Sequence, residues 1–319
     1  MTEPDPIPRF PKATLNRVRS ANPVTAQVLS NDPCLKGKSA SFVRHLVLDV
    51  AGTPLAGAFL PGQSFGVLAP GTDDDGRPHK VRLYSIASPS WGEDGAGCHL
   101  STTPKRLIDE NIPQRPEDDP DDHRLFLGVC SNYLCDLRAG DPVRICGPSG
   151  RRFLLPENRD AHDYLFLATG TGIAPFRGML LELLEGATPC RSRIDLVMGA
   201  PYTTDLLYDD LFRSLADRHP HFHYHTAISR EGRGRYVSDC LSDDPGAFAS
   251  GLASNRTLIY QCGIIGMQYG VYRVLAELGV ADGYLDIGAP LRRRPPAAWS
   301  DAEMKRHVRP TTRCLLELY

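Results

Sequence analysis

The sequence predicts two domains in succession: an antiparallel β-barrel, then an α/β domain whose parallel sheet is covered on both faces. Three observations support this fold class. The chain has 319 residues, enough for about two domains of usual size. Its first half carries short β-branched runs separated by glycine and proline, which is typical of antiparallel strands. After Pro156, short apolar runs alternate with helical patterns, which indicates parallel strands joined by helices.

The first half divides into an arm and a barrel. Residues 1–20 are proline-rich and show no clear period, so we expect an N-terminal arm there. The barrel is expected at residues 21–158. Its candidate strands lie at residues 24–29, 42–48, 64–68, 81–86 and 143–146.

The α/β domain is expected at residues 159–319, and it opens with a strand, a glycine turn and a helix. Residues 164–168 are apolar, residues 169–172 read Thr-Gly-Thr-Gly, and residues 176–184 are apolar at helical spacing. Four parallel strands are expected in all, because the pattern then repeats. The later strands are predicted at residues 194–199, 222–228 and 258–261, and the later helices at residues 206–216 and 267–278.

Composition excludes several classes of protein. The 36 basic and 38 acidic residues leave a net charge of −2, so we expect no nucleic-acid partner. No run approaches about 18 apolar residues, so we expect no membrane span. The start of the chain lacks the apolar stretch of a secretory signal. The chain as a whole has nine cysteines, an odd number that does not suit a framework of disulfides. These features predict reduced thiols and a cytoplasmic protein, and they favour no particular oligomeric state.

Two patterns resemble metal sites, and both have a plainer interpretation. The four histidines that alternate over residues 219–225 would face one way on a strand, as metal ligands do. That run continues into a strand that we expect to be buried, where packing is the simpler explanation. Cys130 and Cys135 open a C-x4-C pattern that no further cysteine continues. We therefore predict no metal site.

Three motifs indicate binding of phosphorylated cofactors. The glycine turn at residues 169–172 lets the backbone approach a pyrophosphate at a helix N-terminus, although such turns also serve ordinary packing. Residues 229–236 end the third α/β strand with three arginines and a tyrosine, which suits an adenosine phosphate or a solvated loop. Arg82 and Tyr84 share one face of a strand and fit a phosphorylated planar group or an ordinary cross-strand pair.

These motifs belong to a longer series of sequence blocks along the chain. The blocks are PGQSFGVLAPG (61–71), RPHKVRLYSIAS (77–88), PKRL (104–107), GVCSNYLCDL (128–137), GPSG (147–150), ATGTGIAPFRGML (168–180), GAPYTTDLLYDDLF (199–212), ISREG (228–232), YQCGIIGMQYGVY (260–272) and LELY (316–319). In these blocks and in their order, the chain resembles the plant-type ferredoxin–NADP⁺ reductases from about residue 24 to Tyr319. The resemblance implies an FAD-binding antiparallel β-barrel followed by a Rossmann-like NADP-binding domain.

The resemblance implies a set of FAD contacts. Arg82 is expected at the FAD pyrophosphate, Tyr84 beside the isoalloxazine ring and Ser85 near flavin N5. The family's adenine-stacking aromatic residue is replaced by Asp109, so the packing of the adenine stays open. The remaining contacts are expected from Leu83, Thr103, Pro104, Lys105, Gly128, Val129, Cys130 and Ser131.

The resemblance also implies a set of NADP(H) contacts. Thr171 is expected to touch both cofactors, and Ala200 and Pro201 to border the NADP pyrophosphate. The 2′-phosphate and adenine are expected at Ser229, Arg230, Tyr236 and either Arg233 or Arg235. The family's common lysine at this site is replaced by Gly234, so the choice between these two arginines stays open. The approach of the nicotinamide is expected to be lined by Gly263 and Ile264.

The function that the resemblance implies is an FAD-dependent reductase. It would exchange a hydride with NADP(H) and single electrons with ferredoxin or flavodoxin, in a direction that stays open. Its catalytic residues are expected to be Ser85, Cys262, Glu317 and Tyr319. The alternatives are the reductase component of an oxygenase and a non-catalytic docking subunit. The presence of these four residues weighs against the docking subunit. Candidate docking cations for an acidic carrier are Lys105, Arg106 and the run Arg292–Arg294, which otherwise belongs to a solvated loop.

Tyr319 generates a first prediction. By the resemblance it covers the flavin face that the nicotinamide must reach, so it must move aside before hydride transfer. Replacing Tyr319 by serine should open that face of the flavin to NADH, which lacks the 2′-phosphate and is expected to bind more weakly than NADPH. We expect the Tyr319→Ser variant to gain NADH-dependent activity, measured as steady-state turnover with NADH and with NADPH. Unchanged NADH turnover would show that Tyr319 does not act as this gate.

Overall fold

The computed structural model describes residues 7–35, 37, 39, 41–110, 119, 124–243 and 245–319. The chain forms two compact units, which we call the β unit and the α/β unit. The β unit contains residues 14–59 and 64–149, and the α/β unit contains residues 7–13, 60–63 and 150–319. Residues 1–6 of the predicted arm lie outside the described residues. Within the described part of the chain, no helix is long and apolar enough to cross a membrane.

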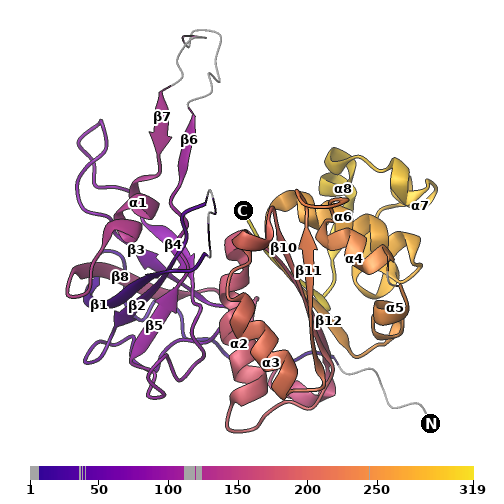
Figure 1. The fold of residues 1–319 in the computed structure, drawn as a ribbon, viewed down its shortest axis with the longest axis horizontal. Coiled ribbons are helices and arrows are strands. Elements are labelled where there is room, and N and C mark those ends of the chain that lie inside the picture. Colours follow the sequence, from indigo (N-terminus) through magenta and orange to yellow (C-terminus); the bar gives the residue numbers. More distant parts are fainter. Residues whose placement is uncertain are drawn as a thin grey trace. The chain divides into compact units, whose positions relative to one another are not determined.

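The β unit is built on a six-stranded antiparallel sheet in the order β4-β3-β8-β1-β2-β5 (Figure 1). The two ends of this order meet, because the Ala87 N–H, just after β4, donates to the Ser101 carbonyl of β5 at 2.8 Å. Alternate side chains such as Leu46, Leu48 and Phe65 fill the core. The strands are β1 (Val24–Pro33), β2 (Arg44–Asp49), β3 (Ser64–Val67), β4 (Arg82–Ser85), β5 (His99–Thr102) and β8 (Pro142–Ser149).

Two further elements complete the β unit. A two-stranded ribbon pairs β6 (Ile108–Glu110) with β7 (Leu125–Leu127), and the short helix α1 (Val129–Asp136) follows directly. The sequence analysis did not predict this ribbon. Three-residue strands are too short for a periodic pattern, so only their pairing identifies them.

The α/β unit is built on a parallel five-stranded sheet in the order β11-β10-β9-β12-β15. Helices α2 and α3 cover one face, and α4, α5 and α6 cover the other (Figure 1). The strands are β9 (Asp163–Thr169), β10 (Ile194–Ala200), β11 (Phe222–Ile228), β12 (Thr257–Gly263) and β15 (Cys314–Leu318). The covering helices are α2 (Ile173–Glu185), α3 (Asp209–Arg218), α4 (Val237–Asp243), α5 (Pro245–Ala253) and α6 (Ile265–Glu277).

Side chains alternate across this sheet as parallel strands buried on both faces require. On one face, the Phe166 ring lies 5.0 Å from the Phe176 ring of α2 and 5.2 Å from that of Tyr260, between centroids. On the other face, Leu165 and Leu167 belong to the core that α4, α5 and α6 complete. The fifth strand, β15, is an addition to the four predicted ones. It lies at the sheet edge, where polar side chains interrupt the apolar run that identifies the central strands.

Smaller elements complete the α/β unit. Strands β13 (Leu285–Ile287) and β14 (Val308–Pro310) pair antiparallel. Helix α8 (Asp301–His307) begins with a capping box between Ser300 and Glu303, the preferred start of a helix. The helix α7 (Ala289–Arg292) carries the first of three consecutive arginines, and Arg292 forms an ion pair with Asp282.

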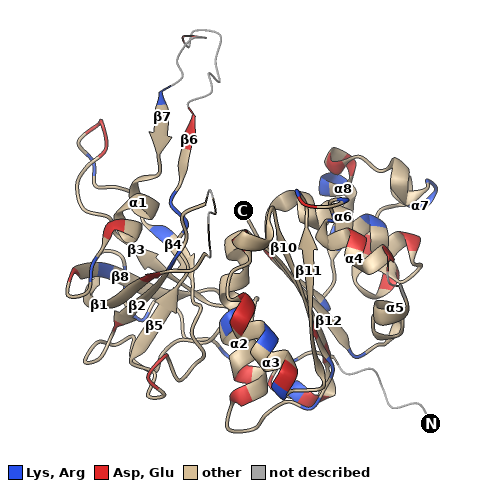
Figure 2. Cartoon of the chain, in the orientation of Figure 1, with Lys and Arg blue, Asp and Glu red and all other residues tan. Residues whose placement is uncertain are grey.

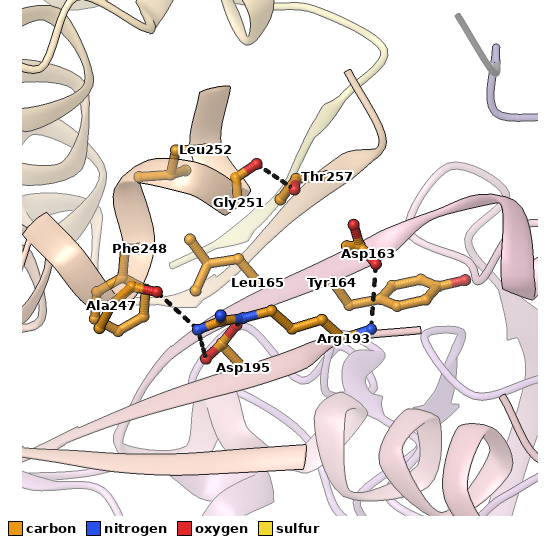
Figure 3. A pocket seen from close by; sticks show the side chains of 10 residues that line it. All are labelled: Asp163, Tyr164, Leu165, Arg193, Asp195, Ala247, Phe248, Gly251, Leu252 and Thr257. Carbon is orange, nitrogen blue, oxygen red and sulfur yellow. Dashed lines mark hydrogen bonds and ion pairs between the residues drawn. The ribbon is translucent and has the colours of Figure 1, made fainter. Parts of the chain in front are cut away.

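A cavity of about 10 Å³, room for about one water molecule, lies at the amino ends of β9 and β10 (Figure 3). Arg193 closes it by donating to both carboxylate oxygens of Asp195, at 2.7 and 3.1 Å, and to the Ala247 carbonyl at 2.7 Å. Nitrogens of His223 and His225 lie 3.4 Å from Oδ1 of Asp195. Two of the alternating histidines thus have a structural partner. Ligand sites of parallel sheets lie at the opposite, carboxyl edge.

All nine cysteines are free thiols, seven of them buried. Among the residues that the structure describes, no three metal-ligating side chains gather in a group that could hold an ion.

Candidate functional site

A cleft of about 830 Å³ opens on the β unit, within the size range of small-molecule sites. Its walls are β4, the segment that leads into β6, the ribbon strand β7 and the first turn of α1. The lining residues are Asp73, His79, Lys80, Arg82, Leu83, Tyr84, Lys105, Leu107, Phe126, Gly128, Val129, Cys130 and Ser131.

Strand β4 forms one wall; among the described strands, it pairs with β3 and stands at the end of the sheet order. Its neighbour β3 is fully buried, whereas Arg82 and Leu83 of β4 are exposed and Tyr84 is half-buried. Ser85 ends the strand, and its carbonyl accepts a hydrogen bond from the Thr102 hydroxyl of β5 at 2.8 Å. It is not among the residues that line the cleft.

The first turn of α1 is fixed against the segment that leads into β6. The Gly128 N–H donates to the Leu107 carbonyl at 3.0 Å, and the Leu107 N–H donates to the Ser131 hydroxyl at 3.2 Å. A Cβ at Gly128 would lie 2.7 Å from Ser131 Oγ and 2.9 Å from Leu107 Cβ, so this position needs glycine. Because the residues of this first turn line the cleft, the cleft meets the N-terminal, positive end of α1, which favours an anion.

The other end of α1 is fixed as well. The side-chain amide of Asn31, on β1, donates to the carbonyls of Leu134 at 2.9 Å and Leu137 at 2.7 Å. These carbonyls belong to the last turn, where helical hydrogen bonds run out.

The cleft has a basic rim and an uncharged floor. Among the described residues that line it, three are lysine or arginine (Lys80, Arg82 and Lys105) and one is a carboxylate, Asp73. Figure 2 shows basic positions on the segment that leads into β6. Burial raises the pKa of Tyr84 and of the neighbouring Cys130 thiol, so both are neutral at pH 7. Such a cleft fits a group that is planar and apolar at one end and polyanionic beyond it.

The structure brings most of the predicted residues of this unit together. Thr103 and Pro104 are buried and do not line the cleft, and the Pro104 carbonyl instead accepts from the Arg44 N–H at 3.0 Å. Those that line it are Arg82, Leu83, Tyr84, Lys105, Gly128, Val129, Cys130 and Ser131.

Sequence reasoning missed Phe126, which lines the same cleft. Its side chain is 54% exposed. Phe126 pairs with Asp109 in the register of β6 and β7, so the two side chains share a face of the ribbon. Leu125 and Leu127 alternate to the other face and do not line the cleft. The signal was available only after the ribbon register was known.

In the α/β unit, the glycine turn at the end of β9 touches the end of β12 closely at two glycines. A Cβ at Gly172 would lie 2.1 Å from the Cys262 carbonyl oxygen. A Cβ at Gly263, whose φ is +140°, would lie 2.1 Å from Thr169 Oγ1. The Ile264 N–H, the first after this contact, donates to the same hydroxyl oxygen at 3.0 Å. Neither glycine has room for a side chain.

Three predicted catalytic residues gather beside this contact. Cys262 and Glu317 are partners in the parallel register of β12 and β15. The Tyr319 N–H donates to the Gly263 carbonyl at 3.0 Å, and the Tyr319 and Thr171 hydroxyl oxygens lie 2.8 Å apart. Burial, and then the charge of Glu317, hold the pKa of the Cys262 thiol well above its ordinary value, so this thiol is neutral.

The ends of β10 and β11 carry the other predicted residues of this unit. The Ser229 N–H donates to the Ala200 carbonyl at 3.0 Å, and the Arg230 N–H donates to the Pro201 carbonyl at 2.9 Å. The exposed Tyr236 follows, directly before α4. The loop between them carries Arg233 and Arg235, which both lie beside Asp243.

Comparison with known proteins identifies relatives over most of the chain. The family model of the oxidoreductase NAD-binding domain matches residues 166–272. The chain is 35% identical over 281 residues to the cyanelle ferredoxin–NADP reductase of Cyanophora paradoxa, covering 84% of this chain and 73% of that one. It is 32% identical over 290 residues to the chloroplastic leaf isozyme 1 of Arabidopsis thaliana, covering 88% and 77%.

A solved structure confirms the predicted fold class. The ferredoxin-NADP⁺ reductase from Plasmodium falciparum superposes with a TM-score of 0.69 at 20% sequence identity, covering 95% of this chain and 99% of that one.

The contact at Gly172 generates a second prediction. The Gly172→Ala variant must move the turn away from Cys262, which should lower the free energy of unfolding by about 1–3 kcal/mol in urea denaturation. Gly266→Ala is the matched control, because that glycine lies in α6 with open space around its Cβ position. We expect the control to keep or slightly raise stability. Equal stabilities of the two variants would contradict the close contact.

Proposed function

Because the chain belongs to the ferredoxin–NADP reductase family, we propose that it exchanges a hydride with NADP(H) at bound FAD and single electrons with ferredoxin. The observation that carries this proposal is the cleft of the β unit. Its basic rim, helix N-terminus and neutral floor fit the pyrophosphate and the planar ring of one flavin dinucleotide. The direction of electron flow depends on the carrier and on the supply of NADPH.

The residues of the β unit would hold FAD as follows. Arg82 and the first turn of α1 bind the pyrophosphate, and Tyr84 and Cys130 pack against the isoalloxazine ring. FAD supplies a hydride acceptor that also exchanges electrons one at a time. Ser85 ends β4 beside Tyr84, and we assign to its hydroxyl a hydrogen bond near flavin N5. Because Tyr84 and Cys130 are neutral, they place no charge beside the isoalloxazine ring.

The residues of the α/β unit would hold NADP(H). The turn at residues 169–172 and the end of β10 at Ala200 and Pro201 bind the pyrophosphate. The loop after β11 binds the 2′-phosphate and the adenine through its arginines and Tyr236. Gly263 and Ile264 line the nicotinamide end. The contribution of the protein is to orient the nicotinamide for transfer.

Four residues act at the nicotinamide. The small, uncharged Cys262 leaves room for the ring without repelling it or attracting water. Glu317 lies across from Cys262 on β15, where its charge favours a nicotinamide ring that becomes positive on oxidation. Tyr319 and Thr171, joined at 2.8 Å, hold the place that the nicotinamide takes.

Ferredoxin is the proposed carrier, because the relatives of the chain are named ferredoxin–NADP reductases. An oxygenase component is therefore not favoured. With a net charge of −2, recognition must rely on local cations. Lys105 lines the cleft, whereas Arg106 is held by Asp136 and Asn132, and Arg294 by Glu303. We further propose the cytoplasm as its compartment, which nine free thiols support.

Phe126 generates a third prediction. Asp109 cannot stack on adenine, whereas the Phe126 ring opposite it lines the cleft and can. Base–aromatic stacking contributes about 1–3 kcal/mol. We expect Phe126→Ala to weaken FAD binding accordingly and to leave binding of FMN, which has no adenine, unchanged. The affinities are measured by titrating the flavin-free protein and following flavin fluorescence.

The control for Phe126 is Leu125→Ala, since Leu125 is an exposed apolar neighbour on the other face of the ribbon. This variant should bind both flavins as the unmodified chain does. Equal losses of FAD and FMN in Phe126→Ala would mean that the ring supports the cleft rather than the adenine.

The fourth prediction tests the proposed function itself. FAD-loaded protein should reduce ferricyanide with NADPH, and NADP⁺ should bind more tightly than NAD⁺ because only NADP⁺ carries the 2′-phosphate. The measurements are a diaphorase assay and a spectroscopic titration of the bound flavin. Absence of NADPH-dependent ferricyanide reduction in FAD-loaded protein would refute the enzymatic function, and equal affinity for the two nucleotides would refute the 2′-phosphate site.

A further inference from the structure

Two arginines of the loop after β11 lie against one carboxylate. Nη2 of Arg233 donates to Oδ2 of Asp243 at 2.8 Å, and Nε of Arg235 lies 3.3 Å from the same oxygen. Figure 2 shows that this loop carries both basic and acidic positions. The guanidinium groups of Arg233 and Arg235 are therefore already partly neutralised before any anionic ligand arrives.

Asp243 occupies an unfavourable place for an acidic residue. It is the last residue of α4, and the C-terminal end of a helix carries partial negative charge. Its two arginine partners compensate for this position. The pairing is nevertheless weakly held, because the side chains of Asp243 and Arg233 are 41% and 74% exposed. The Arg235 side chain is 34% exposed, and its Nε makes no well-aligned hydrogen bond.

The loop is tied by hydrogen bonds of its backbone, such as that from the Arg235 N–H to the Ile228 carbonyl at 2.7 Å, and by the side chain of Glu231. Oε1 of Glu231 accepts from the Thr203 N–H at 2.9 Å, and its Oε2 accepts from the Thr203 hydroxyl at 2.6 Å. A cationic side chain does not fit at position 234, because the φ of Gly234 is +66° and a Cβ there would lie 2.9 Å from the Ser229 carbonyl oxygen. Besides Arg230, the cations of the loop are therefore Arg233 and Arg235.

We propose that Asp243 is an internal counter-ion that competes with the 2′-phosphate of NADP(H) for Arg233 and Arg235. The inference rests on the proposed 2′-phosphate site and adds a residue that opposes it. A dianionic phosphate replaces the carboxylate at the guanidinium groups, since guanidinium pairs strongly with phosphate oxygens. NAD(H) has a hydroxyl at that position and cannot replace the carboxylate. Asp243 thus lowers the affinity for NADP(H) and narrows its preference over NAD(H).

The test measures the 2′-phosphate alone, with 2′-phospho-AMP and AMP as probes in calorimetric titrations of the full chain. Removing the charge of Asp243 in Asp243→Asn should tighten 2′-phospho-AMP binding about two- to five-fold, the range of an exposed ion pair. Binding of AMP should not change. The control is Asp282→Asn, which removes a similar exposed partner, that of Arg292 at 2.8 Å. It should leave both affinities unchanged.

A double-mutant cycle isolates the competition. In an Arg233→Gln, Arg235→Gln background, Asp243→Asn should no longer affect 2′-phospho-AMP binding. Unchanged or weaker 2′-phospho-AMP binding in Asp243→Asn, with a melting temperature like that of the unmodified chain, would overturn the proposal. So would tightening that persists without the two arginines. If the unmodified chain shows no preference for 2′-phospho-AMP over AMP, the 2′-phosphate site itself fails, which is a separate result.

Discussion

The α/β unit depends on the backbone contact between the ends of β9 and β12. Gly172 lies against the Cys262 carbonyl, and Gly263 lies against the hydroxyl and backbone of Thr169, because neither glycine has a side chain. Each strand end thereby fixes the direction in which the other leaves the sheet. In the proposed function, the glycine turn meets the pyrophosphate and Cys262 lies at the nicotinamide. This one contact would then set the spacing between these two parts of the dinucleotide.

The fold could be predicted largely from the sequence because its strands obey simple patterns. Apolar runs such as 164–168 and 194–199 are buried on both faces, and they identify the central strands. The edge strand β15 was missed because Glu317 interrupts its apolar run. The β6–β7 ribbon was missed because strands of three residues have no measurable period. Phe126 became a ligand-cleft residue only through its register with Asp109, which no spacing along the chain reveals.

Candidate site residues that belong to sequence motifs were easier to predict than residues outside the motifs that form ion pairs with them. Arg82, Gly128 and Thr171 stand in recognisable blocks, so the resemblance carried their positions. Asp243 stands outside every block, and only its distance from Arg233 and Arg235 gives it a role. Two of the alternating histidines, His223 and His225, were likewise explained only by their contact with Asp195.

The fixed ends of α1 have a consequence for the cost of binding. Asn31 holds the last turn, and the hydrogen bonds around Gly128, Ser131 and Leu107 hold the first. The conformational entropy of this helix is lost when the chain folds, before any ligand arrives. Little of the binding free energy is then used to order the anion-binding turn, and more of it remains as affinity.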